Sequence, residues 1–318
     1  MSRADAVGSL LCMQRAAAPP RRWARQPSRF REWITADGSS GYRAEPGRYH
    51  LYVARACPWC HRTMIVRDLK GLQDVVGISY AAPYRDERGW AFPGDGFDDA
   101  LHGWEFLSEA YQATDAAYDA RLSAPVLWDS ETGRIVNNES ADIVRMFNDA
   151  FDAWGDASVD LYPEPLRAEI DELNEWIYAD VNNGAYRAGF ARTQEDYDRA
   201  FEDVFAALAR LEGILAERRY LTGDALTEAD WRLWPTLVRF DPVYFTHFRL
   251  NGRRVSDHPN LWGYTRELYQ RPGIAETTSL AEIREHYYTT HDSLNPRHLI
   301  PRGPLDWDLG APHGRDAL

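Results

Sequence analysis

The sequence predicts an α/β domain followed by an all-helical domain, and three observations support this prediction. Short runs of β-forming residues alternate with helical stretches up to about residue 150, whereas apolar residues recur every three or four positions beyond residue 165. A pair of cysteines, at positions 57 and 60, falls where the first strand gives way to the first helix. The length of 318 residues is typical of two domains.

The first half is predicted to contain four strands and three helices. The strands span residues 48–54, 75–82, 124–128 and 134–137, and the helices span residues 58–67, 104–115 and 140–148. Pro58 is favoured at the first position of a helix, and Gly71 is a residue type that ends one. The resulting order is β-α-β-α-β-β-α with a Cys-x-x-Cys turn at the first strand–helix junction, which is the pattern of thioredoxin-like domains.

The second half is predicted to be helical after a linker at residues 152–165. One helical face is formed by Leu166, Ile170, Leu173, Ile177 and Val181, and the next by Tyr197, Phe201, Val204, Phe205, Leu208 and Leu211. Thr227 and Asp230 have the spacing of a helix cap, for which we expect a structural role only. The chain is thus divided into an N-terminal extension (1–47), a thioredoxin-like domain (48–152), an all-helical domain (153–290) and an irregular tail (291–318).

The composition argues against several classes of partner. The 49 acidic and 36 basic residues give a formal charge of -13, which is unfavourable for binding nucleic acid or anionic lipid. No stretch approaches the roughly 18 apolar residues that cross a bilayer. Residues 1–31 contain seven arginines and one acidic residue without a secretory signal, and we expect a disordered or loosely attached leader there. Three cysteines cannot form a disulfide framework, so we expect a cytoplasmic protein in a reducing compartment.

The segment Cys57-Pro58-Trp59-Cys60-His61 is compatible with several kinds of chemistry. Cys-x-x-Cys-His is the attachment signature of c-type haem, but haem attachment usually requires export. A zinc site needs four ligands, of which this segment supplies two, and we expect no metal. Two redox interpretations remain: a dithiol–disulfide oxidoreductase that uses both sulfurs, and an enzyme that forms a mixed disulfide with glutathione through one. A pair of inert core cysteines is the further alternative.

Both redox interpretations depend on a thiolate at Cys57. A thiol at a helix N-terminus accepts backbone N–H hydrogen bonds and experiences the positive end of the helix dipole, so its pKa falls below the usual value of about 8.5. Cys57 has this position, whereas Cys60 lies one turn inside the helix, where we expect it to be buried.

Several segments resemble the glutathionyl-hydroquinone reductases, which are the xi class of glutathione transferases. The segments are Arg48–Gly71, Pro125–Asp129, Ile135–Ser140, Val181–Ala191, Leu221–Trp234 and Leu294–Pro304. Together they span about residues 28–304, and the Cys-Pro-Trp and Asn-Asn-Glu-Ser segments are quite specific. The resemblance implies a glutathione-transferase-type helical domain after the thioredoxin-like domain, and a homodimer.

The resemblance also implies a set of site residues. The implied glutathione-binding residues are Trp90, Arg121, Val126 (after an expected cis-proline, Pro125), Glu139 and Ser140, and the implied catalytic residues are Cys57, Tyr186 and Tyr287. Tyr288 is adjacent to Tyr287, so the second tyrosine stays open between the two. Independently of the resemblance, a helix that starts at Ser140 offers free N–H groups to a carboxylate, and Glu139 can accept from an ammonium group. A plain helix cap is the alternative for this pair.

The implied activity is the glutathione-dependent reduction of glutathionyl-hydroquinones to hydroquinones through a mixed disulfide between Cys57 and glutathione. An omega-like thioltransferase or dehydroascorbate reductase is the alternative enzyme, and a glutathione-binding scaffold without catalysis is the alternative outside enzymes. The chain departs from the family at Cys60, where the family usually has a small apolar residue. This departure leaves open whether one or both cysteines take part in the reaction.

Overall fold

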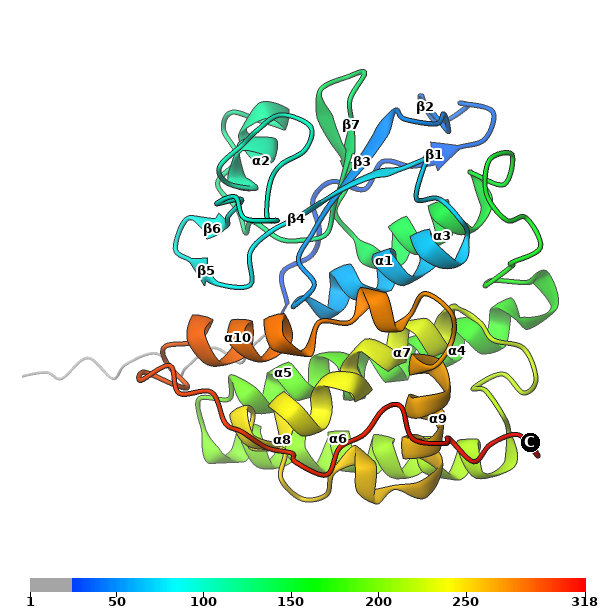
Figure 1. Ribbon diagram of the computed structural model, residues 1–318, viewed down its shortest axis with the longest axis vertical. Helices are drawn as coiled ribbons and strands as arrows, with labels where there is room; N and C mark the ends of the chain where they lie inside the picture. Colours follow the sequence, from blue (N-terminus) through cyan, green and yellow to red (C-terminus); the bar gives the residue numbers. More distant parts are fainter. Residues whose placement is uncertain (1–24) are drawn as a thin grey trace, which may run out of the picture.

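The computed structural model describes residues 25–318, and the first 24 residues of the expected leader lie outside this range. Two layers are stacked in Figure 1: an α/β domain, and below it a larger group of helices. This arrangement confirms the predicted fold class. No helix between residues 25 and 318 combines the length and the apolar character needed to span a membrane.

The α/β domain is built on a four-stranded sheet. Its strands are β3 (Tyr49–Val53), β4 (Gly77–Tyr80), β7 (Val126–Asp129) and β8 (Arg134–Asn137), in the spatial order β4-β3-β7-β8. Strand β3 is parallel to β4 and antiparallel to β7, and β7 is antiparallel to β8. The order and the directions are those of a thioredoxin-like sheet, as predicted. All five residues of β3 are buried, which places the start of the following helix deep in the molecule.

Helices α1 (Pro58–Leu69) and α3 (Ser140–Asp149) lie between this sheet and the helical domain (Figure 1). Helix α2 (Ser108–Thr114) is shorter than predicted. Its expected first turn is absent because the backbone N–H groups of Glu105 and Phe106 donate to the Glu109 carboxylate at 2.8 and 3.0 Å instead. A small hairpin, β5 (Arg85–Asp86) and β6 (Gly89–Trp90), connects β4 to α2.

The segment from residue 25 to residue 47 corrects the expectation of a loosely attached leader. It contains two short strands, β1 (Ile34–Thr35) and β2 (Tyr42–Arg43), and Ile34 is fully buried. Arg31 forms a bridge with Asn137 at the edge of the sheet and donates two hydrogen bonds of 2.7 Å to Asp142. The segment is thus attached by apolar burial and by a bidentate ion pair, which the arginine-rich composition concealed.

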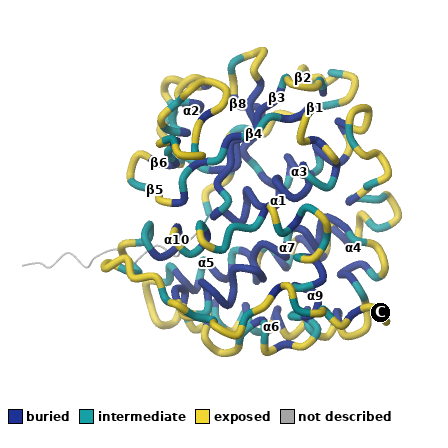
Figure 2. The backbone as a smooth tube through the Cα atoms, viewed as in Figure 1, coloured by how far each residue is buried: buried dark blue, intermediate teal, exposed yellow. Residues whose placement is uncertain are grey.

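The second domain is all-helical, as predicted. Its main elements are α4 (Arg167–Trp176), a π-helical turn η2 (Ile177–Asn182), α5 (Asn183–Gly189), α6 (Gln194–Glu217), α7 (Glu228–Arg239), a second π-helical turn η3 (Phe240–Tyr244), α8 (Phe245–His247), α9 (Pro259–Tyr269) and α10 (Leu280–Thr290), with short 3-10 turns at η1 (Glu164–Leu166), η4 (Val255–Asp257) and η5 (Ala275–Thr277). Figure 2 shows that burial is concentrated where these helices face one another and α1. The cap at the start of α7 is present, because the Asp230 carboxylate accepts from the Thr227 backbone N–H at 2.9 Å.

The tail from residue 291 to residue 318 has no helix or strand in the described structure, as predicted. It nevertheless runs along the helical domain in Figure 1 and is anchored there. Leu309 is buried, and the Arg315 guanidinium donates to the backbone carbonyl groups of Leu215, Arg218 and Arg219.

Candidate active site

Cys57 lies four residues after the end of strand β3, at the N-cap position of α1. Pro58 is the first residue of that helix, as predicted. The cysteine side chain is 7% exposed, and its Sγ lies 3.7 Å from the carbonyl oxygen of Ala124, which precedes a cis-proline, Pro125. The predicted cis peptide is thus confirmed and lies beside the cysteine.

The surroundings of the two cysteines shift the pKa values of their thiols in opposite directions. Burial by itself raises the pKa of the Cys57 thiol, but hydrogen bonds from the Cys60 side chain and from the backbone N–H groups of Cys60 and Trp59, with the charge of Arg25, lower it to about 6 overall. Burial raises the pKa of the Cys60 thiol well above its usual range, and the neighbouring Cys57 raises it further. At neutral pH the thiolate is therefore on Cys57.

The chain around the two cysteines is held by buried polar contacts to the helical domain. Arg239, on α7, donates to the backbone carbonyl groups of Arg55 and Ala56 at 2.9 and 3.1 Å, directly before Cys57. Another nitrogen of Arg239 lies 3.0 Å from His61 Nδ1, and His61 Nε2 lies 2.9 Å from the Thr277 hydroxyl. Both ring nitrogens of His61 are thus engaged in the protein, which argues against its use as a haem or zinc ligand. Within residues 25–318, no three His, Cys, Asp or Glu side chains are grouped to hold a metal ion.

Cys57 faces a small cavity of about 60 Å³ between the two domains. Its lining residues are Arg25, Cys57, Pro58, Trp59, Arg85, Trp90, Arg121, Leu122, Ser123, Ala124, Tyr186, His286 and His291. Three of these side chains are guanidinium groups, and none of the described lining residues is a carboxylate. The local charge is therefore positive although the protein as a whole carries -13, and the cavity attracts an anionic molecule.

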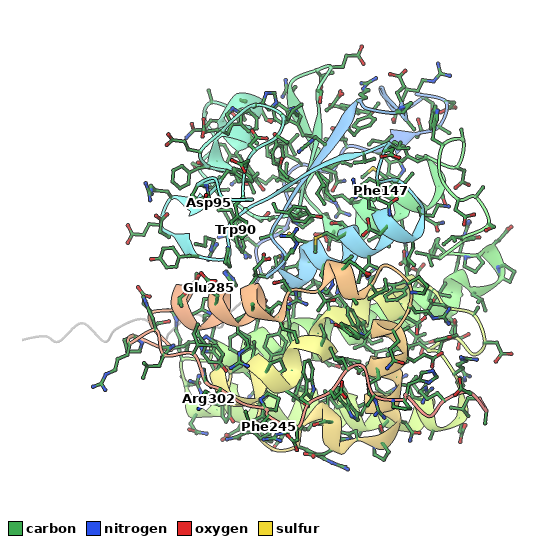
Figure 3. All side chains as sticks on the ribbon, viewed as in Figure 1. Trp90, Asp95, Phe147, Phe245, Glu285 and Arg302 are labelled. Carbon is green, nitrogen blue, oxygen red and sulfur yellow. The ribbon has the colours of Figure 1, made fainter. Side chains whose placement is uncertain are left out.

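Trp90 closes one side of this cavity. It lies at the edge of the α/β domain that faces α10, the helix on which Glu285 is labelled in Figure 3. Its ring stacks on His286 with a centroid distance of 4.9 Å, and Arg85 lies over the same ring at 5.7 Å. The structure thus brings Trp90 and Arg121 to the cysteine, as the sequence-based interpretation expects.

Glu139 and Ser140 do not line this cavity. They lie beside a second cavity of about 310 Å³, which shares Arg25, Arg121 and Ser123 with the first one and extends to Ser28 and Asn138. The Glu139 carboxylate caps α3 by accepting from the Ala141 backbone N–H at 3.2 Å, and it also accepts from the Ser28 hydroxyl at 3.0 Å. The two cavities therefore lie next to each other along a path from Cys57 towards the N-terminus of α3.

The expected position of Val126 differs from the observed one. Val126 is completely buried and pairs with Tyr52 of β3 inside the sheet, so it does not reach the cavity. On the other side of the cis-proline, Ala124 lines the cavity in its place. The sequence alone does not show where strand β7 begins to pair, so it could not show on which side of Pro125 the chain meets the cavity.

The predicted tyrosines meet behind the cavity. The Tyr186 hydroxyl, on α5, lies 2.5 Å from the Tyr287 hydroxyl on α10, and only Tyr186 reaches the cavity lining. Tyr244, at the end of η3, completes the cluster with its hydroxyl 3.0 Å from that of Tyr287. Tyr288 points elsewhere, because its hydroxyl donates to the backbone carbonyl of Pro242. The geometry therefore selects Tyr287 over Tyr288 as the partner of Tyr186.

Tyr244 was not identified from the sequence. Its only sequence signal is a run of aromatic residues around position 244, which also fits an ordinary core. Both π-helical turns adjoin this cluster: η2 ends directly before α5, which carries Tyr186, and η3 ends at Tyr244 itself. Such turns are frequent at functional sites. Burial raises the pKa of Tyr186, and it raises those of Tyr244 and Tyr287 well above their usual range, so all three hydroxyl groups stay protonated at neutral pH.

A thioredoxin-like domain with a cysteine at the N-terminus of its first helix and a cis-proline beside it, followed by an all-helical domain, defines the glutathione transferase class. Two family descriptions match the chain accordingly. "Glutathione S-transferase, N-terminal domain" matches residues 56–150, and "Glutathione S-transferase, C-terminal domain" matches residues 194–267.

Individual relatives narrow the class. The glutathionyl-hydroquinone reductase YqjG of Escherichia coli is 53% identical over 302 residues, which cover 92% of this chain and 92% of that protein. The glutathionyl-hydroquinone reductase PcpF of Sphingobium chlorophenolicum is 46% identical over 285 residues, which cover 89% of this chain and 90% of that protein. The glutathione-bound structure of YqjG has a TM-score of 0.89 over 91% of this chain and 96% of that one. The structure of an xi-class transferase from Natrialba magadii is 49% identical in sequence and has a TM-score of 0.89 over 91% of this chain and 89% of that one. The chain belongs to the xi class of the glutathione transferase family.

Proposed function

We propose that this protein is a glutathionyl-hydroquinone reductase that uses Cys57 as its nucleophile. The observation that carries the proposal is a thiolate-forming cysteine at the helix N-terminus, facing a cationic cavity that is lined by the protonated Tyr186, with Tyr287 and Tyr244 behind it. Two relatives that match nine-tenths of the chain carry the name of this activity. Their names favour this reaction over a general thioltransferase or a scaffold without catalysis.

The first step breaks the bond between sulfur and the aromatic ring. The Cys57 thiolate attacks the sulfur of the glutathionyl group and forms a disulfide with it, while the electron pair of the broken carbon–sulfur bond stays on the ring carbon. That carbon takes up a proton, and hydroquinone leaves. The substrate ring is thereby reduced by two electrons, and the two sulfurs are oxidised to the disulfide.

The second step regenerates the enzyme. The thiolate of a free glutathione attacks the glutathione sulfur of the mixed disulfide, which yields oxidised glutathione and releases the Cys57 thiolate. Because this thiolate has a low pKa, it is a good leaving group. The high pKa of Cys60 makes it a poor competitor for glutathione in this step, so we assign it a structural role.

Glutathione occupies the path formed by the two cavities. Its sulfur lies at Cys57, its cysteinyl backbone pairs at Ala124 (in place of Val126), and its γ-glutamyl end reaches Glu139 and Ser140 at the start of α3. Trp90 and Arg121 flank the tripeptide. A charge of about -1 on glutathione at neutral pH suits a path that is lined by four arginines and one carboxylate, Asp119. The Glu139 carboxylate at the end of this path can accept from the glutathione ammonium.

Tyr186 is the protonated hydroxyl nearest to the departing ring and is our candidate for the group that delivers the proton. Tyr287 and Tyr244 lie behind it and act as positioning residues, because their hydroxyl groups form a chain that ends at Tyr186. The hydrogen bond to Tyr287 favours the phenolate that Tyr186 becomes after it gives up its proton, and solvent that enters the cavity after the hydroquinone leaves replaces that proton.

We further propose a cytoplasmic homodimer. A reaction that consumes reduced glutathione suits the cytoplasm, where that thiol is kept reduced. In the tail, Leu299 is 68% exposed and Leu305 is 84% exposed, and such apolar side chains suit contact with a second copy of the chain. Sedimentation of the full chain tests the dimer, and a monomer at micromolar concentration contradicts it.

Activity on a panel of glutathionyl-benzohydroquinones tests the reaction. We expect release of the free hydroquinone and one oxidised glutathione per turnover in the wild type. Dehydroascorbate and small mixed disulfides serve as competing substrates. A higher kcat/KM for dehydroascorbate than for every member of the panel would identify the protein as a thioltransferase or dehydroascorbate reductase instead.

A further inference from the structure

His286, on α10, is a lining residue of the Cys57 cavity to which the reaction above assigns no task. It lies next to Tyr287 in the chain, its ring stacks on Trp90, and only 7% of the residue is exposed. It thus stands where the glutathione path meets the tyrosine cluster. A polar side chain at this position is within the cavity that would receive the group joined to the glutathione sulfur.

The protonation of the His286 ring follows from its neighbours. Nδ1 lies 2.7 Å from the backbone carbonyl oxygen of Pro83 and 3.3 Å from the Thr290 hydroxyl oxygen. Because a carbonyl only accepts and is the nearer partner, Nδ1 carries the hydrogen. Nε2 is therefore the unprotonated nitrogen with a free lone pair. Among the described residues, no group hydrogen-bonds to Nε2. Burial lowers the pKa of His286 to about 3, so the ring stays neutral and Nε2 stays an acceptor at pH 7.

The other polar side chains of the cavity are mainly donors. The guanidinium groups of Arg25, Arg85 and Arg121 only donate, and the protonated Tyr186 hydroxyl is hydrogen-bonded to Tyr287. Ser123 and His291 also line the cavity, and Nδ1 of His291 already contacts His247 at 3.1 Å. A hydroquinone carries two hydroxyl groups, each of which needs an acceptor once it leaves water. His286 supplies such an acceptor with a fixed orientation.

We propose that Nε2 of His286 accepts a hydrogen bond from a hydroxyl group of the hydroquinone ring and so selects hydroxylated rings. This proposal rests on the proposed function, since it names the part of the site that recognises its substrate. Trp90, held parallel to the His286 ring, keeps Nε2 from rotating away. The bond to Pro83 prevents the opposite tautomer, which would present a donor to the ring hydroxyl.

Two substitutions test the roles of the two ring nitrogens of His286 separately. His286→Asn keeps an N–H group at the place of Nδ1 for Pro83 and removes the acceptor that faces the cavity. His286→Gln places an amide oxygen near Nε2 and gives up the bond to Pro83. The probes are hydroquinone and 1,4-dimethoxybenzene, which has the same ring without hydroxyl hydrogens. Their binding is measured anaerobically by calorimetry on the full chain in the presence of glutathione.

In the wild type we expect hydroquinone to bind about 3- to 10-fold more tightly than the dimethyl ether, the usual effect of one hydrogen bond. His286→Asn should abolish this preference while glutathione alone binds as before, and His286→Gln should retain most of it. The kcat/KM for a glutathionyl-hydroquinone should fall by a similar factor in His286→Asn only.

Three results would overturn the proposal: equal binding of the two probes by the wild type, an unchanged preference in His286→Asn, or an equal loss of glutathione affinity, which would assign His286 to the tripeptide instead. The comparison of the two probes on the wild type needs no variant, so it holds even if a substitution fails to fold. Failure of the proposed function has a different signature, namely no hydroquinone released by the wild type.

Discussion

The low pKa of Cys57 is the property of the site that can be measured most directly. With a pKa of about 6, Cys57 is about 90% thiolate at pH 7, whereas an ordinary cysteine with a pKa of about 8.5 is about 3% thiolate. The structure thus predicts about 30 times more nucleophile at neutral pH than an unperturbed thiol supplies. Since the pKa is lowered, the thiolate is present above about pH 6 and is lost as the pH falls through that value.

The rate of alkylation by iodoacetamide as a function of pH measures this titration. We expect a midpoint near pH 6 in the wild type and no such midpoint in Cys57→Ser. Arg25→Gln should move the midpoint upwards, because the charge of Arg25 is one of the causes of the low pKa and its guanidinium lies 4.1 Å from the ring of Trp59. Arg29→Gln, four residues along the same segment, is the matched control. A midpoint near 8.5, or one that disappears in Cys60→Ser instead, would refute the assignment of the thiolate.

Three further predictions concern binding, the second cysteine and the tyrosines. Glu139→Gln keeps a side-chain oxygen to cap α3, so we expect glutathione affinity to fall by about 1–3 kcal/mol with little change in thermal stability. Unchanged affinity with a lower melting temperature would mean that Glu139 serves only as a helix cap. Ser140→Ala should act in the same direction, measured by the same calorimetry. Cys60→Ala should keep most of the reductase activity. The mechanism with a single cysteine would be contradicted if this variant were inactive and if the oxidised wild type accumulated an internal disulfide between Cys57 and Cys60. Tyr287→Phe should lower kcat more than KM and shift the alkaline limb of the pH profile. The control is Tyr288→Phe, which should leave kcat and the pH profile unchanged because the Tyr288 hydroxyl bonds Pro242 instead of the cluster. Equal effects of the two substitutions would contradict the choice of Tyr287.

The parts of the site that the sequence predicts correctly are local ones. The position of Cys57 between a strand and a helix follows from a few neighbouring residues, and so does the start of α3 at Ser140. Hydrogen bonds within one turn of helix set both features. The sequence pattern therefore carried enough information for them.

The parts that the sequence does not predict depend on contacts between distant segments. Tyr244 and His286 reach the site from helices that follow Cys57 by more than 180 residues, and no spacing within either helix indicates their partners. Arg31 is similar: its ion pair with Asp142 joins residues 111 positions apart. Composition alone suggested a disordered or loosely attached leader there, because the composition gives the charge of a segment but not the residues that this charge contacts.

The mixed disulfide on Cys57 is the central claim, and the intact mass of the protein tests it directly. The reduced wild type is mixed with one equivalent of a glutathionyl-hydroquinone without free glutathione, quenched in acid and weighed. We predict that the protein gains about 305 mass units, the glutathionyl group, while one equivalent of hydroquinone is released, and that Cys57→Ser shows neither. A protein that gains no mass and releases no hydroquinone, or one that gains the mass of the ring instead, would contradict the account.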